Sequence, residues 1–103
     1  MSAETLRRAA SLMRQRAEAA TEGPWRSQRG PGESVVAATE GIAQMTSLRP
    51  REDRRHIASW HPAVALAVAD WLDVQAERVE VGFCGKVGEQ ALTVARAYLG
   101  ESA

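Results

Sequence analysis

The stretch of sequence that decides the fold runs from Asp53 to Asp73 and reads D-R-R-H-I-A-S-W-H-P-A-V-A-L-A-V-A-D-W-L-D. Its second half is apolar at every position from Ala63 to Ala69. A helix that is apolar on nearly every side has to be buried on nearly every side. We therefore expect this segment to form either the central helix of the domain or a contact between subunits.

Two prolines place the helices within this part of the chain. Pro50 is the expected first residue of a short helix to about Trp60, because proline has a helical φ and the first turn does not need its N–H. Pro62 breaks that helix and begins a longer one, which we expect to reach about Val79. The side of the long helix that we expect to face the core is formed by Val64, Ala67, Val68, Trp71, Leu72 and Val79.

Helices are also predicted at both ends of the sequence. Apolar residues at helical spacing predict an amphipathic helix from Ser2 to about Ala20, ended by the pair Gly23-Pro24. A last helix is expected over about Gly88–Leu99, with Gly100 as its stop. The core positions expected in the first helix are Leu6, Ala9 or Ala10, Met13, Ala17 and Ala20.

Short strands are predicted between the first helix and Pro50. Val35–Thr39 and Ile42–Thr46 flank Glu40-Gly41, which is a hairpin signal. An isolated hairpin is marginal, so a third strand near Trp25 or packing on helices is required. The segment Arg29–Ser34 is rich in Gly and Pro and is expected to be a loop. In the expected hairpin, Val36 and Ala38 share a side with Ala43 and Met45, while Val35, Thr39, Ile42 and Thr46 take the other.

The order of these elements predicts an α+β fold. We expect a single domain, residues 1–103, in which a small antiparallel sheet (a hairpin or three-strand meander) packs against three to four helices.

Composition excludes several classes of protein. Residues 1–55 hold ten Arg and seven acidic residues, a net charge of +3, which is far short of the basic stripe of a dedicated DNA binder. The single cysteine, Cys84, excludes an internal disulfide framework and a multi-cysteine zinc site. The apolar run is too short to span a bilayer, and no secretory signal is recognisable. We therefore expect a cytoplasmic protein without a membrane contact.

Catalytic chemistry is weakly supported, and we predict no catalytic residues, no metal ligands and no cofactor. His56 and His61 are five residues apart, whereas zinc ligands on one helix are usually four apart. A nucleophilic pair of Cys84 with either histidine remains an alternative, as does acid–base work by Asp70 and Asp73. Either would make the protein a small hydrolase. The competing interpretation for the two aspartates is a solvated edge or ion pairs with the arginine cluster Arg49–Arg55.

One local basic patch stands out. It extends from Arg49 to Arg55, and two tryptophans near it in the predicted fold could add stacking surfaces, a combination that suits nucleotides or nucleic acids. The competing interpretation is a solvated face with Arg54 or Arg55 paired to acidic residues further downstream in the chain. The candidate ligand-binding residues are Trp25, Arg51, Arg54, Arg55, His56, Trp60 and His61.

Two segments together carry a family resemblance. Thr21 to Trp25 reads T-E-G-P-W after an Ala-rich helix, and Asp53 to Pro62 reads D-R-R-H-I-A-S-W-H-P before A-V-A-L-A-V-A-D-W-L and a final A-L-T-V-A-R-A-Y-L. The chain resembles small accessory proteins encoded by actinobacterial phages and prophages. More loosely, it is similar to the early-region accessory proteins of lambdoid phages, which share a T-P-G-P-W turn and a later D-A-x-x-I-A-x-x-x-P helix.

This sequence departs from the lambdoid pattern at two positions, with Glu22 where Pro is usual and Arg54 where Ala is usual. By analogy, the resemblance implies a role in host takeover, counter-defence or ligand sequestration.

The leading hypothesis is a non-enzymatic accessory protein that binds a host protein or a small ligand. The small apolar residues of Ala63–Ala69 and Ala91–Ala97 permit close helix packing, so we expect a homo-oligomer. Nucleotide or nucleic-acid binding through Arg49–Arg55 is the alternative, and a small hydrolase using His, Cys or Asp is the second alternative.

Overall fold

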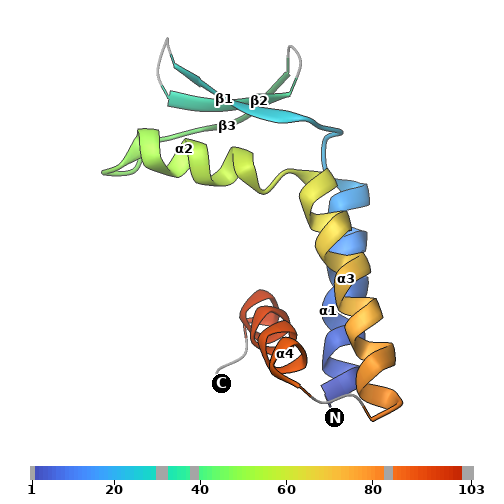
Figure 1. Cartoon of the computed structure of the whole chain (residues 1–103). Coiled ribbons are helices and arrows are strands. Elements are labelled where there is room, and N and C mark those ends of the chain that lie inside the picture. Colours follow the sequence, from blue (N-terminus) through green and yellow to red (C-terminus); the bar gives the residue numbers. More distant parts are fainter. Residues whose placement is uncertain (1, 30–32, 38–39, 83–84, 101–103) are drawn as a thin grey trace. The chain divides into compact units, whose positions relative to one another are not determined.

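The computed structural model describes residues 2–29, 33–37, 40–82 and 85–100. The predicted α+β class is confirmed, with four helices and a three-stranded antiparallel sheet (Figure 1). The elements in chain order are α1 (Ser2–Ala19), β1 (Trp25–Arg29), β2 (Glu33–Ala37), β3 (Glu40–Gln44), α2 (Pro50–Ser59), α3 (Pro62–Glu80) and α4 (Lys86–Leu99).

Contacts divide the chain into two compact units. Met1–Arg16 and Leu66–Ala103 form the first, which we call the helical unit. Ala17–Ala65 form the second, which we call the sheet unit. Each unit has its own buried side chains and is described by itself.

The helical unit is built around alanine. Leu6, Met13 and Leu72 are its largest fully buried side chains among the described residues. Small side chains supply the other buried positions, so the three helices meet through their alanine faces. These buried alanines are Ala9 and Ala10 of α1, Ala69 and Ala76 of α3, and Ala91 and Ala95 of α4.

The core face of α3 is largely the predicted one. Leu72 is fully buried, and Val68, Trp71 and Val79 pack against the core, as expected. The exception is Ala67, which is exposed, whereas Ala69 and Ala76 are fully buried. Every position from residue 63 to 69 is apolar, so periodicity could not separate Ala67 from Ala69. The chain by itself does not bury α3 on nearly every side, so the alternative expectation, a contact between subunits, stays a prediction. Leu66 and Val74 on its outer side are 36% and 52% exposed.

The helix ends follow local rules. Pro50 and Pro62 are the first residues of α2 and α3, as predicted. The carbonyl of His61 accepts hydrogen bonds from the N–H groups of Val64 (3.0 Å) and Ala65 (3.3 Å) in the first turn of α3. At the other end, α4 stops at Gly100, which has the left-handed φ of 77° that glycine tolerates. Within the described ranges, no helix combines the length and apolar character needed to cross a membrane.

The sheet has the predicted third strand but a different hairpin. Its order is β1-β2-β3, with Trp25 at the start of β1. The predicted turn at Glu40-Gly41 was wrong, because both residues lie in β3 and pair with Ala37 and Val36. The predicted Arg29–Ser34 loop was wrong at both ends, since Arg29 closes β1 and pairs with Glu33, the first residue of β2.

The strand register differs from the predicted one because Glu40 and Gly41 lie in β3. Val35 lies opposite Ala43, so these two side chains share a face that the sequence placed on opposite sides. An irregularity between Val35 and Val36 shifts the pairing of β2 with β3. A shift of the pairing by one residue moves side chains to the other face of the sheet. The wrongly predicted turn therefore also gave the wrong faces for these side chains.

Helix α2 covers one face of the sheet. It contacts β1 and β2, and its buried residues are Arg54 and Ala58. Val35 and Ala37 of β2 are buried as well. A buried arginine therefore lies in the contact between α2 and the sheet.

We expect Leu72→Ala to destabilise the protein by about 2–5 kcal/mol, because Leu72 is fully buried and truncation leaves a cavity. Urea denaturation followed by circular dichroism measures this loss. Leu48→Ala is the matched control, because it removes the same atoms from a fully exposed side chain, and it should change stability by less than about 0.5 kcal/mol. Equal effects of the two substitutions would contradict the assigned core face.

Candidate functional site

An ion pair between α2 and β2 lies at the centre of the predicted basic patch. The Nε of Arg54 donates to Oε2 of Glu33, and the Arg54 side chain is only 6% exposed. A buried guanidinium must be paired, because an isolated charge in an apolar contact is very costly. Arg54 therefore joins the helix to the sheet, which leaves it poorly placed to bind a ligand.

Two further arginines surround the same carboxylate. The hydrogen bond from Arg54 holds the pKa of Glu33 below its ordinary value, and the positive charges of Arg54, Arg51 and Arg29 lower it further. Arg29 and Arg51 are both exposed. The end of β1 and the first turn of α2 thus bring exposed arginines close to a carboxylate that is already paired.

The two flanks of α2 differ in charge. Residues advance by about 100° each around a helix, so Arg51 and Arg55 share one flank while Asp53 and Ile57 share the other. The flank of Asp53 faces the segment after β3, because the Ser47 hydroxyl donates to Oδ2 of Asp53. A shallow depression on that side is lined by Gln44, Met45, Thr46, Ser47, Asp53, His56 and Ile57. Arg51 and Arg55 therefore lie on the flank away from β3, on the side of β1.

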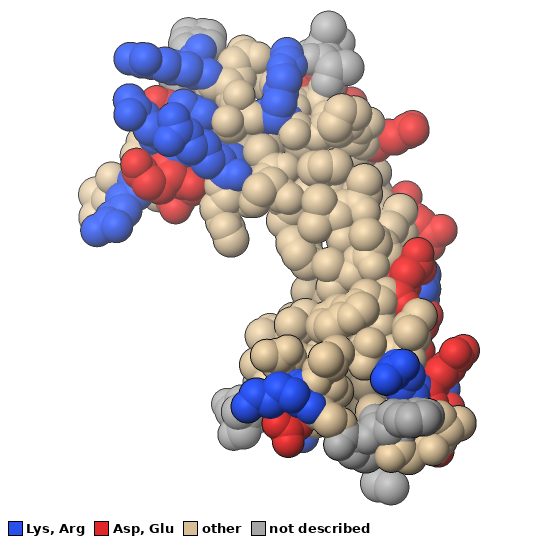
Figure 2. Space-filling view, viewed as in Figure 1, with Lys and Arg blue, Asp and Glu red and all other residues tan. Residues whose placement is uncertain are grey.

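Basic side chains gather over α2 and the neighbouring sheet in the view of Figure 2. Not all of the predicted ligand-binding residues lie beside these basic side chains. His56 is exposed and lines the depression beside β3, so it is separated from Arg51 and Arg55 by the curvature of the helix. Trp60 follows α2 as its C-cap and is 40% exposed.

Trp25 and His61, two of the predicted ligand-binding residues, both contact the turn between α1 and β1. The Nε1 of Trp25 donates to the carbonyl of Thr21 at 2.9 Å, which ties the start of β1 to the turn before it. The Nδ1 of His61 is buried and has no hydrogen-bond partner among the described residues. A Cβ placed on Gly23 would lie 3.2 Å from this nitrogen, so the absence of a side chain at Gly23 lets the turn approach the imidazole.

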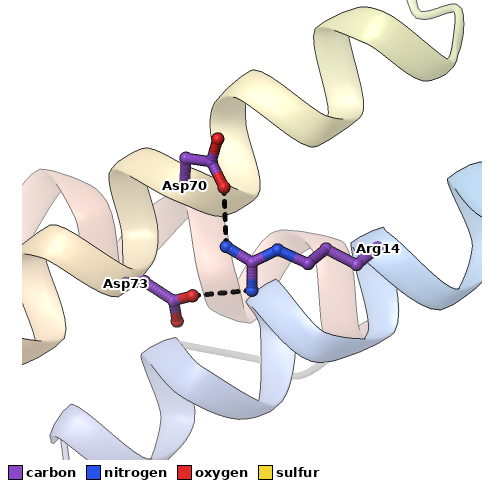
Figure 3. A network of polar contacts seen from close by, with 3 residues as sticks. All are labelled: Arg14, Asp70 and Asp73. Atoms are coloured by element: carbon purple, nitrogen blue, oxygen red, sulfur yellow. Dashed lines mark hydrogen bonds and ion pairs between the residues drawn. The ribbon is translucent and has the colours of Figure 1, made fainter.

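The two aspartates of α3 are engaged by one arginine of α1 (Figure 3). Nη2 of Arg14 lies 2.7 Å from Oδ1 of Asp70, and Nη1 lies 2.6 Å from Oδ2 of Asp73. The side chains of Asp70 and Asp73 are 75% and 40% exposed. They therefore form a surface ion-pair network, with a partner that differs from the Arg49–Arg55 patch.

Among the described residues, no group of three or more His, Cys, Asp or Glu side chains is placed to hold a metal ion. Cys84 lies outside the described residues, so the alternative of a Cys–His pair stays a prediction.

Sequence reasoning missed Glu33 and Arg29. Both fell at the edges of the predicted loop, and their importance comes from pairing across the sheet and from α2. Glu33 and Arg54 are 21 residues apart, and no local pattern links them. A charged residue amid the buried positions of a short helix was the available signal, since such a residue needs a partner.

No family model, curated protein or solved structure matches this chain.

We expect Glu33→Gln to remove a part of stability that depends on pH. Because Arg54 lowers the pKa of Glu33 in the folded state, its contribution is fully present above the ordinary Glu pKa and is lost as the pH falls through the folded value. The stability difference between wild type and Glu33→Gln should thus be largest near neutral pH and shrink below about pH 4.3.

Urea denaturation at several pH values measures this difference. Glu80, whose pKa is lowered by its hydrogen bond from Arg7, contributes equally to both proteins and cancels. A stability difference that is constant from neutral to acidic pH would contradict the assigned pair.

Proposed function

We propose that this chain is a non-enzymatic accessory protein of phage or prophage origin that acts in the host-cell cytoplasm by binding a host protein. The observation that carries the proposal is the exposed group of arginines beside β1, where Arg29, Arg51 and Arg55 surround a sheet with an open edge. Arginine is enriched in protein interfaces, and open strand edges are common docking sites for other chains. The resemblance to phage accessory proteins supports the biological setting.

The charge balance favours a protein partner over a nucleic acid. Arg54 is engaged by Glu33, and Glu52 and Asp53 lie on the same helix. With Arg26 and Arg29 of β1 included, six arginines are set against these three carboxylates, which leaves a net charge of +3. This excess is far short of the basic stripe of a dedicated nucleic-acid binder, so this surface is a weak polyanion site.

Co-purification of the full chain from an actinobacterial host tests the proposal. We expect one host protein at a fixed stoichiometry, resistant to nuclease treatment, as measured by light scattering and intact mass spectrometry. The double variant Arg29→Glu with Arg51→Glu should lose that protein while keeping its circular dichroism spectrum. Recovery of the chain alone, or with nucleic acid that nuclease removes, would contradict the proposal.

Self-association is a second part of the proposal, and it concerns the helical unit. Apolar side chains of α3 and α4 remain exposed, including Val74 at 52% and Val87 at 51%. A unit of this size with three large fully buried side chains is expected to be marginal alone, so covering this surface with a second copy would stabilise it.

We expect the purified chain to be a dimer or larger by light scattering at micromolar concentration, and Val74→Glu to shift it toward the monomer. Ser11→Glu, at an exposed position of α1, adds the same negative charge and serves as the control. A strict monomer across the whole concentration range would contradict self-association.

A further inference from the structure

The outer edge of β1 has free main-chain groups. β1 is an edge strand that pairs with β2 on one side, and no described strand pairs with its other side. The N–H of Met45 donates to the carbonyl of Glu33 at 2.8 Å, so the polar groups of Glu33 point toward β3. In an antiparallel sheet the direction alternates with each residue, so Ser34 and Val36 point toward β1.

The same alternation fixes the polarity of β1. Gln28 lies opposite Ser34 and Arg26 lies opposite Val36, so these two residues of β1 turn their main-chain groups toward β2. Trp25, Ser27 and Arg29 consequently turn their N–H and C=O groups outward. These residues recur at every second position, which is the spacing with which an added strand pairs.

The β1 edge is regular, whereas the β3 edge is not. Five consecutive residue pairs join β1 to β2 without interruption, from Trp25–Ala37 to Arg29–Glu33. The pairing of β3 with β2 is shifted between Val35 and Val36. Irregularities of this kind twist an edge strand and protect it from pairing with another chain. An added strand therefore fits β1 better than β3.

Positive charge lines the β1 edge. Arg26 and Arg29 are exposed on the strand itself, and Arg51 and Arg55 are exposed on the flank of α2 that lies on the side of β1. The nearest carboxylate, Glu33, is already bonded to Arg54. A second copy of this chain that added its own β1 would oppose one set of arginines to another, which electrostatic repulsion disfavours.

We propose that the β1 edge binds an extended acidic segment of a protein partner as a fourth strand of the sheet, an inference that rests on the proposed function. Main-chain groups of the segment pair with Trp25, Ser27 and Arg29. Its carboxylates meet Arg26 on one face of the sheet and Arg29, Arg51 and Arg55 on the other. The main-chain pairing supplies general affinity, and the arginines select acidic sequences.

Fluorescence anisotropy of the full chain with a labelled peptide of alternating Glu and Thr tests this inference. The peptide combines carboxylates with residues that favour strands. A peptide of alternating Glu and Pro keeps the charge but lacks the N–H at every second residue and disfavours a strand, and one of alternating Lys and Thr reverses the charge. We expect binding of the Glu-Thr peptide, binding by the Glu-Pro peptide at least about tenfold weaker, and no binding of the Lys-Thr peptide.

Two pairs of variants separate charge from main-chain pairing. Arg51→Glu with Arg55→Glu should weaken binding by about tenfold or more, whereas Lys86→Glu with Arg96→Glu, which makes the same change in net charge on α4, should not. Ser27→Pro removes an outward N–H at an edge position where the isolated sheet tolerates proline, and it should weaken binding relative to Ser27→Ala. The arginine variants keep the test decisive if Ser27→Pro fails to fold.

Amide hydrogen exchange locates the bound peptide. Protection should rise at Trp25, Ser27 and Arg29 when the Glu-Thr peptide is added, with no change in β3. Equal binding of the Glu-Pro peptide, insensitivity to Arg51→Glu with Arg55→Glu, protection along β3, or tighter binding of single-stranded DNA through these arginines would each overturn the inference. If the peptide does not bind but a host protein still co-purifies with the chain, the acidic-strand inference fails and the proposed function stands.

Discussion

The burial of Arg54 is the constraint on which the sheet unit depends. A guanidinium inside the contact between α2 and β2 requires a charged partner, and Glu33 supplies it. The pair fixes the position of α2 along the sheet, because a sliding or turning helix would leave one or both charges buried without a partner. It also determines which arginines remain accessible. Arg54 turns inward, and Arg51 and Arg55 are left on the flank that faces away from β3.

This arrangement changes the meaning of the basic patch. In the sequence, the arginines from Arg49 to Arg55 form one cluster, with histidines and tryptophans as neighbours. In the structure they divide by role: Arg54 is part of the fold, Arg51 and Arg55 line a flank of α2, and Arg49 is the N-cap residue of that helix. His56 belongs to a different depression, beside the segment that follows β3. A surface with this modest excess of charge next to an open strand edge suits a protein segment better than a phosphate polymer.

Helix ends were predicted correctly where a single residue determines them. Pro50 and Pro62 begin helices because the proline ring fixes φ, and Gly100 ends α4 because glycine tolerates a left-handed φ. Predictions that depend on distant partners were less successful. Ala67 was assigned to the core face of α3 because the segment is apolar throughout, and the predicted register of β2 with β3 depended on a turn at Glu40-Gly41, two residues that lie in β3. The resemblance to phage accessory proteins stays an expectation about origin.

For the candidate site, too, single residues were predicted from the sequence but their distant partners were not. Arg51, Arg54 and Arg55 were found because charged residues are visible in a sequence. Their different roles depend on Glu33 and Arg29, which reach the same place only through the pairing of β1 with β2 and the packing of α2. Arg54 occupies a helix position that faces the core. A buried arginine needs a charged partner, so its position in the sequence implies a carboxylate elsewhere in the chain.

The most direct test of this account is a double-mutant cycle on Glu33→Gln and Arg54→Met, measured by urea denaturation at neutral pH. Methionine keeps an apolar side chain in the contact with β2 and removes the charge. The account predicts that each single substitution lowers the free energy of unfolding and that the double variant loses much less than the sum of the two losses. Strictly additive losses would show that the two side chains do not act on each other, and would contradict the central role of the pair.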